Sequence, residues 1–169
     1  PWRIFFDPNR TPDSQASAAF LIFISLFALA SLSYGLNVLK EKKRKVASKE
    51  FSRIGFPILV IVAGLFIGVL GIYLSKSLLT WFPIVGIYVS TTQLRYWRIE
   101  PDEKMHWWYA HMSGMITACI ATITAFLVTA MPRIYPGMNT LVVWLAPTFI
   151  LVPLLIMWTK KYRRQFGDL

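Results

Sequence analysis

The sequence has 169 residues, of which 56% are hydrophobic and 15% are charged, and its mean hydropathy is +0.52. This composition excludes an ordinary soluble globular domain and predicts an integral membrane protein. The net charge of +10 comes without a basic face or a nucleic-acid-binding module, so we do not expect nucleic acid as a partner. Cys119 is the only cysteine, which excludes an intrachain disulfide and a thiolate metal cluster built from one chain.

Residues 1–15 mix aromatic, basic and acidic side chains, which predicts a tail at the membrane interface, although a disordered tail explains this composition equally well. Thr11, Pro12 and Asp13 follow the pattern of a helix start, with Thr11 as the N-cap. Residues 16–39 carry no charge and exceed the roughly 20 residues needed to cross a bilayer. We expect the first spanning helix there.

A strongly basic loop follows this helix. Most of the 18 Lys and Arg residues fall in this loop, around residues 95–104 and near the C-terminus. Because cytoplasmic loops are enriched in Lys and Arg, this distribution predicts the N-terminus outside and the C-terminus inside. Five residues at the start of the loop are predicted to contact anionic lipid headgroups at the cytoplasmic face: Lys40, Lys42, Lys43, Arg44 and Lys45.

The second expected span covers residues 56–74 and carries Gly64, Gly68 and Gly71 on nearly one face. Glycines on one face let another helix approach closely. Dimerisation through Gly64 and Gly68 is one use of such a face, but we favour packing within the chain because it is the commoner use.

The third expected span, residues 78–94, follows so closely that it has to form a tight antiparallel hairpin with the second. Thr80 is a candidate N-cap, which would place Pro83 in the first turn. The fourth span covers residues 104–131, and we expect its helix to begin at Pro101, before the membrane does.

The fifth span covers residues 139–159, and residues 162–169 form a basic cytoplasmic tail. Pro147 and Pro153 interrupt the hydrogen-bond ladder of this helix, so neighbouring helices have to cover the kink. Together these elements predict an all-α, polytopic transmembrane helix bundle of about five spans.

The fourth helix carries small residues over a wide arc, with Gly114, Ala118 and Thr122 on one side. Small residues over so wide an arc imply neighbouring helices on at least two sides. We therefore predict that this helix is the buried centre of the bundle.

Both histidines lie on this helix. The aromatic cluster Trp107-Trp108-Tyr109 marks the headgroup level, which places His106 at the interface and His111 where the hydrocarbon begins. His111 is the stronger candidate for a functional residue. One interpretation is a neutral imidazole that pairs with a neighbouring helix or with water. The other is axial ligation of a haem iron or of the magnesium of a chlorophyll-type pigment.

Geometry limits the second interpretation. His106 and His111 are about 140° apart around the helix, so they cannot ligate the two faces of one metal. The sequence indicates no other kind of site. The histidines are not spaced with a carboxylate as in a zinc or di-iron centre, and no nucleophile is paired with a base as in an enzyme. A small transporter is a third and weaker functional hypothesis. The spans lack charged residues at membrane depth, and the sequence shows no inverted repeat, although both are usual in ion-coupled carriers.

Four stretches resemble a group of uncharacterised bacterial multi-span membrane proteins, most firmly over residues 101–161. They are His106-Trp-Trp-Tyr-Ala-His111-Met-Ser-Gly-Met115, Ala121-Thr-Ile-Thr-Ala-Phe-Leu-Val128, Trp144-Leu-Ala-Pro-Thr148 and Trp158-Thr-Lys-Lys161. The resemblance implies a multi-span fold and a further histidine-containing hydrophobic region upstream, but no activity. It marks these positions for attention: His111, Gly114, Met115, Thr124, Phe126, Pro147 and Thr148.

The leading functional hypothesis from the sequence is a non-catalytic subunit that packs in and stabilises a larger respiratory or photosynthetic membrane complex, in the inner membrane of a bacterium. The alternative is a haem- or (bacterio)chlorophyll-binding membrane protein with His111 as axial ligand and His106 as a weaker candidate.

Overall fold

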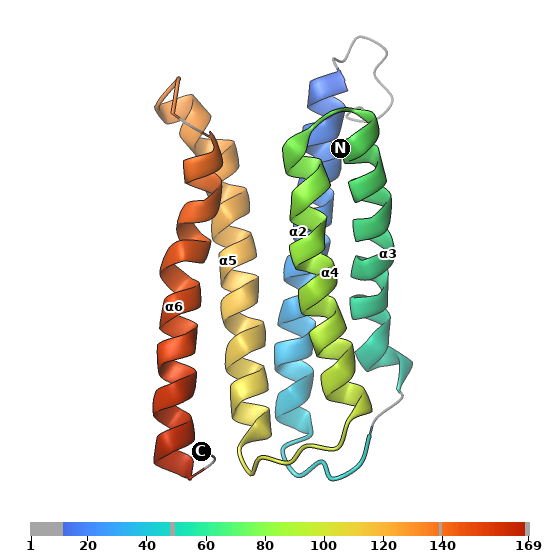
Figure 1. The fold of residues 1–169 in the computed structure, drawn as a ribbon, viewed down its shortest axis with the longest axis vertical. Helices are drawn as coiled ribbons and strands as arrows, with labels where there is room; N and C mark the ends of the chain where they lie inside the picture. The colour runs from blue at the N-terminus through green and yellow to red at the C-terminus, as the bar shows by residue number, and fades with distance from the viewer. Residues whose placement is uncertain (1–11, 48–49, 139, 168–169) are drawn as a thin grey trace.

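The computed structural model describes residues 12–47, 50–138 and 140–167, and within these ranges the chain contains helices and no strands. The five helices are α2 (Pro12–Lys40), α3 (Phe51–Tyr73), α4 (Ser77–Arg98), α5 (His106–Ile134) and α6 (Thr140–Phe166) (Figure 1). The predicted all-α bundle is therefore confirmed. The proposed N-cap Thr11 and most of the predicted tail lie outside the described residues.

Four of the five helices are long and apolar enough to cross a membrane: Gln15–Lys40, Phe51–Tyr73, His106–Ile134 and Val142–Phe166. They indicate an integral membrane protein. The described part of α4 does not meet the same criterion, because its second half carries Ser90, Gln93 and Arg95 among other polar residues. It nevertheless packs along α3 as the predicted third helix of the bundle.

The helix at the centre of the bundle is α2. It packs against α3, α4 and α5, whereas the backbone of α6 approaches only α5 among the described helices. The share of the most apolar stretch that is buried is 39% in α2, compared with 22% in α5 and 17% in α6. The prediction that residues 104–131 form the buried centre is wrong, although α5 does have neighbours on two sides.

Aromatic side chains explain why α2 takes the central place. Phe20, Phe23 and Phe27 lie within one face of α2 and contact the ring of Phe82 on α4, with centroid distances of 5.1, 5.9 and 6.4 Å. Trp144 of α6 also reaches this cluster, 4.7 Å from Phe82. Large rings on α2 fill the space between several helices, which the small side chains of α5 cannot do.

The predicted hairpin of α3 and α4 depends on two of the three glycines. A Cβ atom at Gly71 would lie 2.5 Å from the backbone of Leu79 and Thr80, and one at Gly64 would lie 2.9 Å from Ile87. A Cβ at Gly68 would meet nothing within 4 Å. Gly64 and Gly71 therefore sit at helix contacts, whereas the packing role predicted for Gly68 is not realised.

Several helix ends differ from the expected ones. Because α3 and α4 begin earlier than predicted, Pro57 and Pro83 lie in the second turn, and Lys76 rather than Thr80 is the N-cap of α4. The start of α5 at His106 leaves Pro101 outside the helix.

The two C-terminal helices run further than expected. Pro132 lies inside α5, which ends at Ile134, and α6 continues to Phe166, through most of the predicted tail. Helices that pack against a neighbour continue past signals that would end an isolated helix.

The two glycines Gly71 and Gly68 give a matched test of the hairpin. We expect Gly71→Ala to lower the free energy of unfolding by about 1–3 kcal/mol, because its methyl group would overlap rigid backbone. Gly68→Ala should be neutral or slightly stabilising, since alanine is the better helix former. Thermal unfolding of the purified protein in detergent measures both, and equal effects would contradict this account of the hairpin.

Candidate functional site

His111 is held by a hydrogen bond between two helices. Its Nδ1 lies 2.8 Å from the backbone carbonyl oxygen of Gly35 on α2. A carbonyl oxygen can only accept, so Nδ1 carries the proton, and Nε2 of the neutral ring keeps its lone pair. The half-buried imidazole thus links α5 to α2, as the pairing interpretation expects, and still offers one nitrogen as an acceptor or ligand.

The hydrogen bond forms where α2 and α5 come closest. A Cβ atom at Gly114 would lie 2.9 Å from the Cα atom and 3.0 Å from the nitrogen of Gly35. In the reverse direction, a Cβ at Gly35 would lie 3.2 Å from the sulfur of Met115. Gly114 is therefore at a helix contact, and no flat ring can lie between α2 and α5 at this level.

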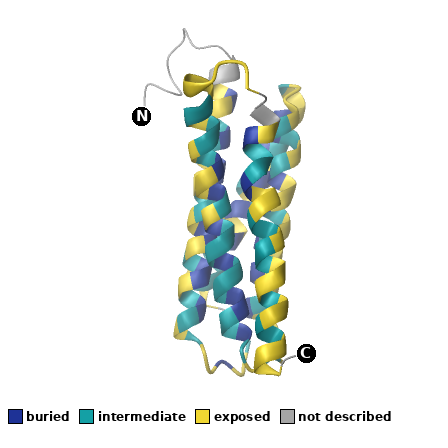
Figure 2. Ribbon diagram, turned by 90° about the vertical axis from the view of Figure 1, so that its left-hand side faces the viewer, coloured by how far each residue is buried: buried dark blue, intermediate teal, exposed yellow. Residues whose placement is uncertain are grey.

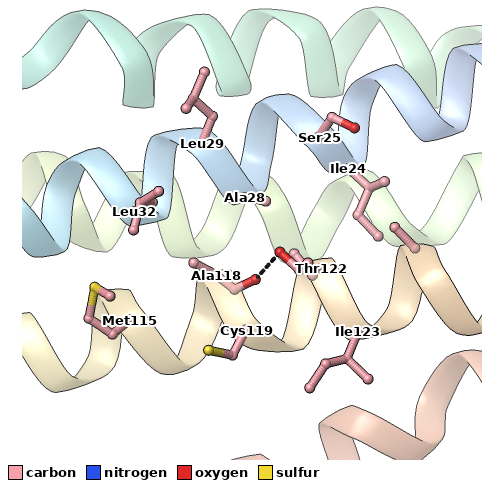
Figure 3. Close-up of a pocket in the computed structure, with 12 residues that line it drawn as sticks. Ile24, Ser25, Ala28, Leu29, Leu32, Met115, Ala118, Cys119, Thr122 and Ile123 are labelled. Atoms are coloured by element: carbon pink, nitrogen blue, oxygen red, sulfur yellow. Dashed lines mark hydrogen bonds between the residues drawn. The ribbon is translucent and has the colours of Figure 1, made fainter.

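Further along α5 the two helices leave a groove of about 540 Å³ between them. Figure 3 shows Met115, Ala118 and Thr122 on the side of α5 that faces Ala28 and Leu32 of α2. The Thr122 hydroxyl donates to the Ala118 carbonyl of its own helix at 2.9 Å. Ala118 is buried at the groove wall, whereas Thr122 is exposed rather than packed against a helix.

The groove is apolar, and His111 is not among the residues that line it. Ser25 Oγ donates to the Leu21 carbonyl at 2.7 Å, so the two hydroxyls of the groove, those of Ser25 and Thr122, are both satisfied within their own helices. A tetrapyrrole in this groove would therefore not be ligated by His111.

His106 lies in a different environment. Its Nδ1 is 2.8 Å from the hydroxyl oxygen of Tyr96, near the end of α4. Burial raises the pKa of the Tyr96 hydroxyl, with Arg44 opposing the shift, so the phenol stays protonated. The phenol and Nδ1 share one hydrogen bond, whose donor depends on the tautomer of the ring. The two histidines thus contact different helices and do not form one site, which agrees with their predicted separation around α5.

Arg44 is not a lipid-facing residue. Only 8% of it is exposed, and its guanidinium donates to the carbonyls of Tyr96, Trp97 and Ile99 at 2.7, 3.3 and 3.1 Å. The same group lies over the ring of Tyr96, 4.6 Å from its centroid. Arg44 therefore satisfies carbonyls at the C-terminal end of α4, where a positive charge is also favoured by the helix dipole.

The other four predicted headgroup residues, Lys40, Lys42, Lys43 and Lys45, are exposed, and the Lys42 ammonium lies 4.7 Å from the ring centroid of Trp107. Ion pairs connect the segments at this end of the bundle. Arg53 contacts Glu41 at 2.8 Å, and Arg163 of α6 contacts Glu103 of the loop before α5 at 2.8 Å. The structure thus gathers the three basic segments at one end (Figure 1).

One polar cluster was missed by the sequence analysis. The Gln93 amide nitrogen of α4 lies 3.3 Å from the hydroxyl of Ser31 on α2, and both side chains are buried. The hydroxyls of Ser90 and Thr124 are also buried and make no hydrogen bond with the residues that the structure describes. Ser90 and Gln93 lie three residues apart and therefore on one face of α4, and this spacing was the signal available in the sequence.

No group of three or more His, Cys, Asp or Glu side chains comes close enough to hold a metal ion within the described ranges. The features that could serve a function are therefore the hydrogen bonds at helix contacts, the lone pair on Nε2 of His111 and the apolar groove between α2 and α5.

Arg44→Lys tests the cap on α4. We expect the change to lower the free energy of unfolding by about 1.5–3 kcal/mol, because an ammonium cannot donate to several carbonyls in the fork that arginine makes. Lys45→Gln, an exposed neighbour, should change it by less than about 0.5 kcal/mol. Thermal unfolding in detergent compares the two, and a lysine that fully replaces Arg44 would argue against the cap.

No family model, curated protein or solved structure matches this chain. Its function therefore has to be argued from the features described above.

Proposed function

We propose that this chain is a non-catalytic integral membrane subunit that packs in and stabilises a larger membrane complex, respiratory or photosynthetic, in a bacterial inner membrane. The observation that supports the proposal is a backbone carbonyl on the exposed side of α6 that lacks the donor it would have in a regular helix.

That group is the carbonyl of Phe149. In a regular helix it would accept from the N–H of residue 153, but Pro153 has no N–H. Among the described residues, neither a loop N–H nor a side chain donates to it. Phe149 is 72% exposed, and Pro153 is exposed as well. The helix carries much of its surface uncovered, as Figure 2 shows for the helix that leads to the C-terminus.

Inside a bilayer an unsatisfied carbonyl is costly, because no water is present to donate to it. Among the described helices, α5 is the only one whose backbone α6 approaches, and Phe149 lies exposed rather than against it. The other intrahelical proline of α6 differs in this respect: Pro147 is buried, and so is Val143, whose carbonyl it frees. A neighbouring membrane protein that covers the Phe149 face would provide the donor.

Charge supports the membrane assignment at the other end of the molecule. Lys40, Lys43 and Lys45 lie exposed where α2 ends, beside the basic C-terminal part of α6. Such a cluster next to spanning helices attracts anionic headgroups at the cytoplasmic face.

Photo-crosslinking tests the proposal with two phenylalanines of nearly equal exposure. Phe149 of α6 is 72% exposed and Phe66 of α3 is 69% exposed. With a benzophenone amino acid at position 149 in native membranes, we expect a defined protein adduct after irradiation. The same group at position 66 should label lipid only. Lipid labelling at both positions, together with a protein that purifies as a lone monomer, would contradict the proposal.

The second candidate function is binding of a haem or chlorophyll-type pigment by His111. One observation favours it: a hydrogen bond from Nδ1 to a backbone carbonyl is the arrangement that orients a ligating histidine and leaves Nε2 free. The ring would have to approach from outside the α2–α5 contact, because Gly35 and Gly114 leave no space there.

His111→Ala separates the two functions. If His111 only pairs with Gly35, the purified wild-type protein is colourless, and the variant loses about 1 kcal/mol of stability. His111→Gln, which keeps a donor, should lose less. Visible absorbance in the wild type that disappears in His111→Ala would favour the second candidate. The visible spectrum and thermal unfolding of the three proteins give the answer.

A further inference from the structure

We propose that the protein that covers the exposed face of α6 is a second copy of this chain, related to the first by a twofold axis along the membrane normal. The inference rests on the proposed function, because it names the partner at the surface described there.

The surface carries a hydroxyl donor beside the Phe149 carbonyl, from which Pro153 removes the usual helical donor. Thr148 is exposed, and its hydroxyl makes no hydrogen bond with any described residue. Thr122 and Thr129 differ, because their hydroxyls donate to carbonyls of their own helices. The hydroxyls of Ser90 and Thr124 also make no hydrogen bond with any described residue, but both are buried inside the bundle. Thr148 is adjacent in sequence to Phe149, so the free hydroxyl and the free carbonyl lie within about one helical turn of each other.

Symmetry makes this pair self-complementary. Two copies that share one orientation in the bilayer are related by a twofold axis along its normal. Each residue then lies at the same depth in the membrane as the same residue of the other copy. About 100° separates positions 148 and 149 around the helix, so a seam between them places Thr148 of one copy beside Phe149 of the other. The Thr148 hydroxyl donates to the Phe149 carbonyl of the other copy, and the axis repeats the bond.

The apolar residues of α6 follow the same seam. Leu145, Phe149, Val152 and Ile156 are spaced four, three and four residues apart, which is the repeat of helices that pack side by side with a small crossing angle. None of the four is buried within the chain. A parallel pair of α6 helices would cover all of them.

The glycines of α3 do not offer an alternative contact between copies. Ile87 and Phe23 of the same chain already cover Gly64, with atoms 2.9 and 3.4 Å from the position of a Cβ. The pair Gly64 and Gly68 is therefore not open to a second helix, whereas the α6 seam is.

Disulfide crosslinking of the full chain in native membranes tests the inference. In a Cys119→Ser background, Ile156→Cys places one thiol on the seam, and Val69→Cys places one on the exposed side of α3. Ile156 is 50% exposed and Val69 is 68% exposed. We expect oxidation to give a disulfide-linked dimer of the chain from Ile156→Cys and none from Val69→Cys.

The hydrogen bond is tested in the Ile156→Cys protein. Thr148→Val should lower the dimer fraction about fivefold or more, and Thr148→Ser should restore it, because serine keeps the donor. Pro153→Ala supplies the missing N–H within the helix, so it should also weaken the dimer, while the thermal stability of the monomer in detergent stays equal or rises.

Three outcomes overturn the inference. The first is no dimer from Ile156→Cys while the benzophenone at position 149 captures a different protein, which leaves the proposed function standing. The second is an Ile156→Cys dimer that Thr148→Val leaves unchanged. The third is neither dimer nor adduct, which removes the inference and the proposed function together.

Discussion

Polar groups at membrane depth have to be satisfied inside the protein, because the hydrocarbon offers no donor or acceptor. Most features of this structure follow from that constraint. The Thr122 hydroxyl turns back to its own helix, and Gln93 reaches Ser31 on another. Arg44 folds over the end of α4. Among the described residues, the buried hydroxyls of Ser90 and Thr124 make no hydrogen bond, and the Phe149 carbonyl lacks its usual helical donor. Of these three groups only the Phe149 carbonyl belongs to an exposed residue, and the contact that we propose is made there.

Gly35 shows how one small residue serves two of these contacts. Its missing side chain lets α5 approach until Gly114 touches the α2 backbone, and the approach brings the Gly35 carbonyl within 2.8 Å of His111. Close packing and the hydrogen bond therefore depend on each other. A larger residue at either glycine would separate the helices and also leave the imidazole without its acceptor.

The helices could be predicted from the sequence because long uncharged runs allow few other structures in a membrane. The tight α3–α4 hairpin and the separation of His106 from His111 follow from spacing alone. The central position of α2 could not be predicted, because almost every residue of a spanning helix is apolar and the pattern does not show which face meets protein and which meets lipid. Gly68 and Gly71 look equivalent in the sequence for the same reason.

The basic residues after the first helix were equally hard to assign from the sequence to lipid or to protein contacts. Five basic residues in a row of six read as one headgroup patch, yet Arg44 among them is buried, since only the fold brings the carbonyls of α4 to it. The ligating capacity of His111 was visible in the sequence, but the Gly35 carbonyl that fixes its tautomer belongs to a helix 76 residues away.

The position of Arg44 also has a consequence for synthesis of the protein. The residue leaves the ribosome just after α2, but the carbonyls of Tyr96, Trp97 and Ile99 that it binds are made more than fifty residues later. Until then, in the topology predicted from the sequence, the arginine is one more positive charge that favours the cytoplasmic side for this loop. Once the α3–α4 hairpin has returned to that side, the same arginine joins the loop to the end of α4. The same side chain thus contributes to the topology of the emerging chain and later, through its hydrogen bonds, joins the loop to α4 in the folded bundle.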